Sequence, residues 1–546
     1  MLLITALSVG WPITAAAFVI ADPDHPAASR AQSRLAVPKA PLAPVVTNGS
    51  WPVYHRDNGH TGFDPTLPPA IGATAGWTSP VLDDRIFASP LIYGGIVYAV
   101  TLNNTVYALN QSDGSAIWSR NLRTPESGGW LCGNVSPQGI LGTPAIDPLT
   151  NRIFVVTLDI LDDHYRLEGL NLVTGVVEVN TDITAYSIAN SVGFDWTIQQ
   201  QRGALAVANG YVYVPVGGRW GDCGNYHGWV FAVPTNGGPI THFYVAPGRG
   251  AGFWAAGGVV IDNSTNKVFA TSGNGTGGCA ANPDGSPVFE ENAVVRLSPT
   301  LAHEEAFIPQ DWANPYCSND EDLGGAGPLL ISPNLMFQAG KAGGGFLLDP
   351  NALGGLDGQR FPTPKPQTYS QADVCFSNTH DATFGSFAYA APFVYLECEA
   401  RGIVALHVDT AAPSFVPCTS TSCPSPNWRA GSGITFGPPI VAAGLVWAAT
   451  SGGGLYAFRA DTGAQIYHSA NFFINHFVTP SEAGGQVFVP ADNPNVIRQF
   501  VMLFGTAQSS PAPIPARQPV LPAPTAAAPS RPTVNQSTPA PSPLGR

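Results

Sequence analysis

The stretch VYALNQSDGSAIW, residues 106–118, decides the fold. At 106–110 the residues Val, Ala and Asn alternate with Tyr and Leu, as expected for a β-strand whose two faces differ. Asp113 and Gly114 form a hairpin signal, because glycine takes the positive φ that such turns need. Trp118 ends the unit. The same pattern returns at LEGLNLVTGVVEV (167–179) and LYAFRADTGAQIY (455–467). One hairpin cannot bury its apolar face alone, so the recurrence predicts a repeat architecture.

One strand of the repeat can be counted along the chain. It occurs at 94–100, 151–156, 209–216, 266–271, 333–339, 391–397, 443–449 and 484–490. Each copy has a strand before it and a strand after it, and most have a fourth. Four strands in each of eight units predict an all-β, eight-bladed β-propeller, with seven blades as the alternative. The eighth unit lacks a clear fourth strand. We expect the segment 76–80, with Trp77, to supply it and close the ring.

The composition divides the chain into four parts. Residues 1–21 are uncharged and mostly apolar and predict a signal peptide, although no basic residue precedes the apolar run. Residues 22–50 form an Ala/Pro-rich linker, 51–504 the propeller, and 505–546 a disordered Pro/Ala-rich tail. These features predict a secreted or otherwise extracytoplasmic protein, expected to be a monomer. Any membrane contact would run through an uncleaved N-terminal segment.

The charge of the chain restricts its partners. The net charge is −13, and only 11% of residues are charged, against about a quarter in an average soluble domain. No basic stripe is available to neutralise phosphates, so a nucleic-acid partner is not expected. The partner is predicted to be a small molecule or an extracellular protein.

The repeat resembles a known family. The units VYALNQSDGSAIW and LYAFRADTGAQIY, with the leader WPVYHRDNGHTGF (51–63), are similar to the PQQ-like, or quinoprotein, β-propeller repeat over roughly residues 51–504. The family includes quinoprotein dehydrogenases, an outer-membrane assembly lipoprotein and many secreted proteins of unassigned role. For the dehydrogenases, the resemblance implies pyrroloquinoline quinone (PQQ) and calcium as cofactors. This chain departs from them, because it has no adjacent Cys pair, no CxxCH haem motif and no recognisable calcium ligands.

The connecting segments are very unequal in length. Turns from the first to the second strand of each unit are short, and most turns from the third to the fourth are short too. The remaining connections are often long, as in GGRWGDCGNYHG and AGKAGGG. In an antiparallel blade these long connections emerge on one face, which we call the long-loop face. Loops on a rigid scaffold commonly carry binding and catalysis, so we expect the functional site there.

All eight cysteines fall in or beside these long loops. They are Cys132, Cys223, Cys279, Cys317, Cys375, Cys398, Cys418 and Cys423. An even number in an exported chain favours disulfides, and the spacing fits no zinc motif. Eight cysteines allow 105 pairings. Chain order on the long-loop face suggests Cys279–Cys317, Cys375–Cys398 and Cys418–Cys423, which leaves Cys132–Cys223.

Seven polar or aromatic residues are candidates for the lining of the central funnel. They lie near the first strand of a unit or in a loop on the same face: Arg202, Trp220, Trp254, Asn274, Lys341, His380 and His476. Arg202 or Lys341 could hold an anion, and a tryptophan could stack on a planar ligand. The alternative is a purely structural role, in which these side chains hydrogen-bond only to each other or to trapped water. The glycines around Lys341 would let the backbone approach a ligand. No catalytic residue or metal ligand is assigned.

Two acidic runs, LDILDD (158–163) and SNDEDLGG (318–325), could supply oxygen ligands to calcium, but a solvated acidic loop is the favoured interpretation.

The leading functional hypothesis is a ligand- or protein-binding scaffold that works through the long-loop face. The first alternative is a PQQ- and calcium-dependent dehydrogenase of alcohols or sugars, and the second is a cell-envelope assembly factor. A fold hosts many functions, so these hypotheses rest partly on analogy.

Overall fold

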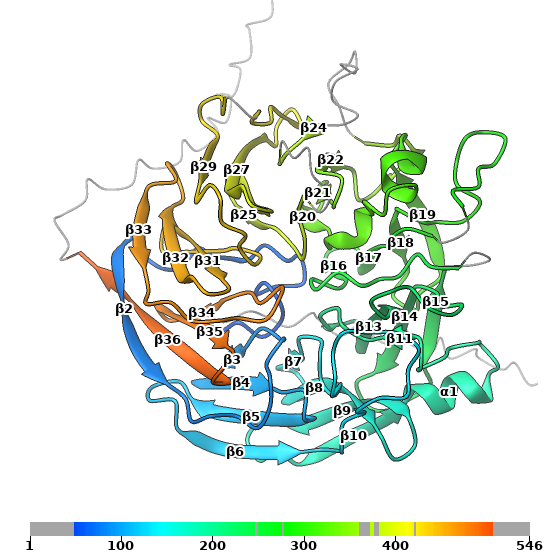
Figure 1. The fold of residues 1–546 in the computed structure, drawn as a ribbon, viewed down its shortest axis with the longest axis horizontal. Helices are drawn as coiled ribbons and strands as arrows, with labels where there is room; N and C mark the ends of the chain where they lie inside the picture. Colours follow the sequence, from blue (N-terminus) through cyan, green and yellow to red (C-terminus); the bar gives the residue numbers. More distant parts are fainter. Residues whose placement is uncertain are drawn as a thin grey trace, which may run out of the picture. The chain divides into compact units, whose positions relative to one another are not determined.

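The computed structural model describes residues 49–245, 249–275, 278–359, 372–375, 382–419 and 422–505 (Figure 1). The segments expected to be a signal peptide and a disordered tail lie outside the described residues, apart from Gly505, as does nearly all of the expected linker. No helix among the described residues is long and apolar enough to cross a membrane.

Eight antiparallel sheets form eight blades, which confirms the predicted number. Blade 1 has β3 (Leu91–Tyr93), β4 (Ile96–Val100), β5 (Thr105–Asn110) and β6 (Ala116–Asn121). Blade 2 has β7 (Ala145–Asp147), β8 (Arg152–Asp159), β9 (His164–Asn171) and β10 (Val177–Asp182). Blade 3 has β12 (Ala206–Ala208), β13 (Tyr211–Gly218), β14 (Trp229–Pro234) and β15 (Thr241–Tyr244), with β11 (Gln199–Gln200) paired to β13. Blade 4 has β16 (Val260–Asp262), β17 (Lys267–Thr271), β18 (Val294–Leu297) and β19 (His303–Ile308), and β23 (Gly355–Leu356) joins its outer edge.

The other four blades follow the same plan. Blade 5 has β20 (Leu329–Ser332), β21 (Leu335–Ala339), β22 (Gly344–Leu348) and β24 (Ala372–Asp373). Blade 6 has β25 (Ala388–Ala390), β26 (Phe393–Cys398), β27 (Gly402–Asp409), β28 (Ser414–Phe415) and β29 (Trp428–Ala430). Blade 7 has β30 (Ile440–Ala442), β31 (Leu445–Thr450), β32 (Gly454–Arg459) and β33 (Gln465–His468). Blade 8 has β34 (Ser481–Ala483), β35 (Gln486–Ala491), β36 (Val496–Phe504) and, from the other end of the chain, β2 (Ala70–Thr78).

Among the residues that the structure describes, three short helical segments interrupt the strands. They are α1 (Ile183–Ala189), a kinked π-helical segment (Trp312–Cys317) and a 3-10 turn (Leu323–Gly325). Asp182 caps α1 by accepting a hydrogen bond from the backbone N–H of Ala185, the usual role of an N-cap carboxylate. The sequence analysis expected none of these helical turns. All three lie in connections between or after strands, so the all-β class holds.

The ring closes through the N-terminal strand, as the count of strands predicted. β2 pairs antiparallel with β36, from Ala70 opposite Phe504 to Thr78 opposite Arg498. The innermost strand of blade 8, β34, contacts β3 of blade 1. Figure 1 shows β2 beside β36, with blue and orange strands in one blade. Pairing the two chain ends leaves no open sheet edge between the first and last blades.

The Gly and Trp of the repeat hold neighbouring blades together. The indole of Trp77 lies over Gly114 of the next blade, where a Cβ would come within 2.4 Å of the ring. Its Nε1 donates a hydrogen bond to the carbonyl of Gln111, 3.0 Å away. Trp118 and Trp428 repeat this arrangement over the turn glycines of the next blades, Gly175 and Gly463. Glycine is therefore needed at these positions both for its positive φ and for its missing side chain.

The leader, residues 51–64, circles the axis of the propeller. Its backbone and side-chain groups hydrogen-bond to the second residue of the innermost strand in each of blades 1 to 7. These residues are Ile92, Ile146, Val207, Ile261, Leu330, Tyr389 and Val441. In blade 8 the matching residue is Glu482, whose buried carboxyl group lies close to that of Asp64, and burial, with the nearby Asp64 charge, raises the pKa of Glu482 well above its ordinary value. β1 (Phe63–Asp64) also pairs parallel with β30. One segment thus contacts every blade.

The leader closes the propeller channel at one end. The innermost strands end at the short turns, so the leader lies near the face opposite the long loops. Most of its side chains are buried, with Trp51 and His55 at 0% exposure. The channel is therefore a funnel that opens on the long-loop face.

Candidate functional site: the funnel on the long-loop face

Four aromatic rings meet at the centre of the funnel. They come from loops that precede the innermost strands of blades 4, 6 and 8: Trp254, Phe384, His476 and Phe477. The Trp254 and Phe384 ring centroids are 6.2 Å apart, and those of Phe384 and Phe477 are 5.3 Å apart. His476 stacks on Phe477 with 3.7 Å between centroids. Trp254 and His476 thus lie together at the funnel that the sequence analysis predicted for them. The sequence analysis did not predict Phe384 or Phe477 there.

Arg202 brings a positive charge to these rings. Its guanidinium lies 4.3 Å from the centroid of the Phe477 ring, a cation–π contact. The side chain is half-buried, and no carboxylate among the described residues pairs with it. Burial lowers the pKa of Arg202 to about 10, so it stays charged at neutral pH. An enclosed cavity of about 10 Å³ lies beside it, between Tyr54 of the leader and Phe477.

A strained loop presents His476 and Phe477. Phe477 has φ +68°, a conformation that bulky residues rarely adopt and that is often found at functional sites. Two hydrogen bonds fix the loop: Asn475 Nδ2 donates to the carbonyl of Ile86 (3.1 Å), and Ser451 Oγ donates to that of Ile474 (3.0 Å). Enclosure by protein, and secondarily the charge of Arg202, lowers the pKa of His476 to about 4. The imidazole is therefore neutral at pH 7.

A cleft of about 450 Å³ leads from the long-loop face to this loop. It lies over blade 7 and is lined by glycine backbone, hydroxyl and amide groups, and aromatic rings. The side chains include Thr435, Phe436, Ser451, Tyr456, Asn475, His476 and Phe477. Its volume falls in the range of pockets that hold small molecules. His476 and Phe477 border both this cleft and the cavity beside Arg202, so the two spaces are neighbours.

Lys341 lies in the funnel but its charge is already balanced. Its Nζ is 2.8 Å from Oδ1 of the buried Asp322 and 3.5 Å from Oδ2 of Asp320. Trp254 Nε1 donates a hydrogen bond to the other oxygen of Asp322, at 2.7 Å. Burial raises the pKa of the Asp322 carboxyl, and Lys341 opposes this effect. The Lys341 group therefore forms a structural ion pair beside the Trp254 ring, 5.5 Å from its centroid.

The glycines that flank Lys341 serve a purpose different from the expected one. A Cβ on Gly340 would lie 2.6 Å from the Cα of Leu323, so this glycine lets two backbone segments pack closely.

The other predicted site residues lie in different surroundings. Asn274 Nδ2 donates to Asp320 at 2.9 Å and so belongs to the network of Lys341. Trp220 is 69% exposed and lines neither the cavity beside Arg202 nor the cleft over blade 7. His380 lies outside the described residues.

The two acidic runs are not simply solvated loops, and this interpretation needs correction. In the second run, Asp322 is 1% exposed and paired with Lys341. In the first, Asp159 is buried and contacts Arg123 at 3.2 Å and Arg166 at 3.7 Å. The segment expected to be a long loop here is a tight turn between β8 and β9, which extend to Asp159 and from His164.

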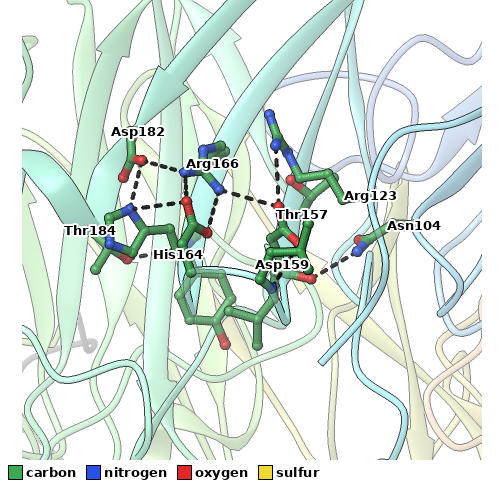
Figure 2. Close-up of polar contacts among 12 residues, drawn as sticks. Asn104, Arg123, Thr157, Asp159, His164, Arg166, Asp182 and Thr184 are labelled. Carbon is green, nitrogen blue, oxygen red and sulfur yellow. Dashed lines mark hydrogen bonds and ion pairs between the residues drawn. The ribbon is translucent and has the colours of Figure 1, made fainter. Parts of the chain in front are cut away.

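Figure 2 shows the network around the first acidic run. Asp162, His164 and Asp182 place three possible metal-ligating atoms within 4.8 Å of one another. Arg166, however, pairs with Asp162 and lies 2.9 Å from Asp182 Oδ2. His164 Nδ1 bonds to the same oxygen of Asp182 at 2.7 Å. Because the guanidinium of Arg166 already pairs with both carboxylates, the cluster is better described as an ion-pair network than as a calcium site.

Four disulfides join the long loops in the pairs suggested by chain order. They are Cys132–Cys223, Cys279–Cys317, Cys375–Cys398 and Cys418–Cys423. The first bridges the connection from blade 1 to blade 2 and the loop between β13 and β14 of blade 3, and the guanidinium of Arg219 stacks 4.0 Å from the Trp130 ring centroid. Four disulfides in one chain are typical of proteins outside the cytoplasm.

Comparison with known proteins agrees with this architecture. Residues 73–219 match the family model described as outer membrane protein assembly factor BamB. The matched segment is thus similar to the PQQ-like β-propeller repeat of that family. The propeller is similar to quinohemoprotein alcohol dehydrogenase from Comamonas testosteroni, with 15% identity, 85% of this chain and 82% of that chain covered, and a TM-score of 0.62.

Two further solved structures show the same likeness of fold. Quinohemoprotein alcohol dehydrogenase ADHIIG from Pseudomonas putida HK5 has 17% identity, coverage of 86% and 82%, and a TM-score of 0.59. A europium-containing methanol dehydrogenase has 14% identity, coverage of 81% and 89%, and a TM-score of 0.57. No curated protein matches the sequence significantly. At these identities the likeness concerns the fold of the PQQ-like propeller.

The residues on the axis of this PQQ-like propeller do not fit a quinone of the size of PQQ. The centre is packed by the four aromatic rings and by Arg202. The cavity that remains, about 10 Å³, has room for roughly one water molecule. A planar three-ring cofactor is far larger than that. None of the four disulfides joins adjacent cysteines, and none of the cavity-lining residues beside Arg202 is a cysteine.

Proposed function

We propose that this protein is an extracytoplasmic binding protein that takes a small-molecule ligand into the cleft of the long-loop face. The observation that carries the proposal is the shape of the channel. The leader closes one end of it by bonding to the innermost strands of blades 1 to 7, and the other end opens into a cleft of about 450 Å³ over blade 7. Such a one-ended, preformed concavity on a rigid scaffold is typical of small-molecule sites.

Three properties of the cleft support ligand binding. Hydrogen-bonding groups line it, including the exposed hydroxyls of Thr435 and Ser451. The aromatic ring of Tyr456 offers an apolar surface beside them. The strained backbone at Phe477 marks the inner end, where such strain commonly serves a site. The disulfide-linked loops suit an oxidising compartment outside the cytoplasm.

The proposal can be tested by filling the cleft. A panel of monosaccharides, amino acids and short carboxylic acids is screened for stabilisation of the folded protein, which a ligand of the native state must cause. Compounds that raise Tm should lose this effect in Thr435→Trp, because the indole would occupy the cleft. The matched control is Val173→Trp, which is 66% exposed on the opposite face. Equal responses in both variants, or no response of the wild type to any compound, would refute the proposal.

A further inference from the structure

A second groove, of about 290 Å³, lies on the face opposite the long loops, between blades 6 and 7. The short turns that join β25 to β26 and β30 to β31 form part of its wall, as does the segment that follows the leader. Aromatic rings and other apolar side chains dominate the wall, among them Phe63, Pro65, Leu67, Pro392, Phe393 and Tyr395.

Polar side chains in the wall are already engaged. The Tyr395 hydroxyl donates to a backbone carbonyl of blade 7, 3.0 Å away. Asp461 pairs with Arg459 at 3.1 Å, and Asp64 lies 3.7 Å from Arg56. An occupant of the groove therefore gains mainly by burying apolar surface, and an N–H group that it buries there would find few acceptors among these side chains.

The described chain ends beside this groove. Ala70 of β2 pairs with Phe504 of β36, one residue before Gly505. Leu67, which lines the groove, is three residues from Ala70 and hence within about 11 Å of it along the chain. The C-terminal tail therefore starts within roughly 15 Å of the groove.

The first proline cluster of the tail, PAPIP at residues 511–515, suits such a wall. Three of these five residues are prolines, which have no N–H group to leave unpaired. A proline-rich segment also loses little conformational entropy on binding and commonly occupies aromatic-lined grooves. At about 3.1 Å per residue, the six residues from 505 to 511 span up to about 19 Å, which is enough to reach the groove.

We propose that residues 511–515 of the tail bind in the groove between blades 6 and 7 of the same chain. This contact is independent of the proposed function, because the groove and the cleft lie on opposite faces of the propeller. The tether keeps the segment at an effective concentration on the order of millimolar, so even a weak contact is substantially occupied. Because so weak a contact should alter Tm little, the test follows protection of the tail instead.

Limited trypsin digestion of the full-length protein tests the proposal. Arg517, two residues beyond the segment, is followed by Gln518, whereas Arg531 is followed by Pro532, a bond that trypsin does not cut. Mass spectrometry therefore reads cleavage of the 517–518 bond as the release of residues 518–546. Ala391→Glu places a charge in the apolar groove and should accelerate this cleavage roughly 3- to 10-fold, since cleavage follows the free fraction of the tail.

The matched control is Ala411→Glu, because Ala411 is also exposed, on another turn of blade 6, and does not line the groove. It should leave the cleavage rate unchanged, and both variants should melt with the wild type. A millimolar excess of the free peptide SSPAPIPA (509–516) should displace the tail, which accelerates cleavage of the wild type but not of Ala391→Glu. Equal cleavage rates in the wild type and Ala391→Glu, or a wild type that does not respond to the peptide, would overturn the proposal. Protection that grows with protein concentration would also overturn it, in favour of tail exchange between two copies.

Discussion

The ammonium of Lys341 lies 2.8 Å from the carboxylate of Asp322, which is 1% exposed. This ion pair connects the segment between blades 4 and 5 with the loop between β21 and β22 of blade 5, beside Trp254, which donates to the same carboxylate. Removing one partner of a buried pair leaves an uncompensated charge, which usually costs more than the pair contributes. The effect of changing Lys341 is therefore expected to be on stability.

The Lys341→Ala variant should be destabilised by roughly 3–5 kcal/mol, the typical cost of breaking a buried ion pair. Urea unfolding measures the difference. The double variant Lys341→Ala/Asp322→Asn should recover part of the loss, because it no longer buries an unpaired charge. Lys267→Ala removes a surface pair with Glu304 and serves as the control, with an expected change below about 1 kcal/mol. A Lys341→Ala protein as stable as the wild type would show that Asp322 is not held as the structure indicates.

Closure of the ring predicts a contrast between two deletions. Removing residues 74–80 takes away part of β2 and the Trp77 indole that packs on Gly114, so blade 8 loses its outer strand. We expect a clearly lower Tm and a protein prone to aggregate through the exposed edge of β36. Removing residues 508–546 should leave Tm nearly unchanged. Scanning calorimetry of both truncated proteins decides the matter, and equal Tm values for the wild type and the 74–80 deletion would be incompatible with the closed ring.

The blades could be predicted from sequence because their signals are local. The turn at Gly114, the alternation before it and Trp118 after it lie within 13 residues, and eight copies reinforce one another. The missing strand of blade 8 followed from counting, since Trp77 had no other unit to join. Three disulfide pairs followed from chain order because neighbouring loops in a propeller are often neighbours in sequence, and Cys132–Cys223, 91 positions apart, followed by elimination.

The leader and much of the site could not be predicted in the same way. The hydrogen bonds that carry residues 51–64 around the axis join backbone groups up to hundreds of positions apart, and no residue pattern records them. Lys341 could be singled out by its residue type, but its partner Asp322 could not, because Asp322 lies in an acidic run that looks like a solvated loop. The positive φ of Phe477 leaves no signal in the sequence either. The segment FFINHF (472–477) offered only an aromatic cluster in a loop, which alone says little about position.

Two buried histidines of the leader predict a loss of stability in acid. Burial lowers the pKa of His55 to about 4 and that of His60 to about 3, from an ordinary value of 6.5. Below pH 6.5 the unfolded chain therefore binds protons that the folded chain does not, so the free energy of unfolding should fall as the pH decreases towards 4. For His60 the loss between pH 6.5 and 4.5 is on the order of 2 kcal/mol.

The variant His60→Asn isolates this effect. Asn tolerates the positive φ at this position (+59°) and does not titrate. Urea unfolding at pH 7.0, 5.5 and 4.5 should show a shallower decline in acid than the wild type. His468→Asn, at a surface position of blade 7, should keep the wild-type slope. Parallel profiles for His60→Asn and the wild type would mean that His60 is protonated in the folded protein.

The buried carboxyl of Glu397 predicts a slope of opposite sign at higher pH. Glu397 is 2% exposed and accepts a hydrogen bond from the backbone N–H of Phe384, 2.7 Å away. Burial raises its pKa from 4.5 to about 8. Between these values the folded chain keeps a proton that the unfolded chain releases, so stability from this group is present at low pH and is lost as the pH rises towards 8.

Glu397→Gln should therefore be least favourable relative to the wild type near pH 5 and most favourable near pH 8, because glutamine keeps the hydrogen-bond acceptor without ionising. The comparison needs urea unfolding of both proteins at several pH values between 5 and 8.5. Glu178→Gln is the matched control: the Arg152 ion pair lowers the pKa of this exposed carboxyl, so its titration falls below the window. A constant difference in the free energy of unfolding between Glu397→Gln and the wild type across the range would show that Glu397 is ionised in the fold, and that the loop bearing Phe384 admits water to it.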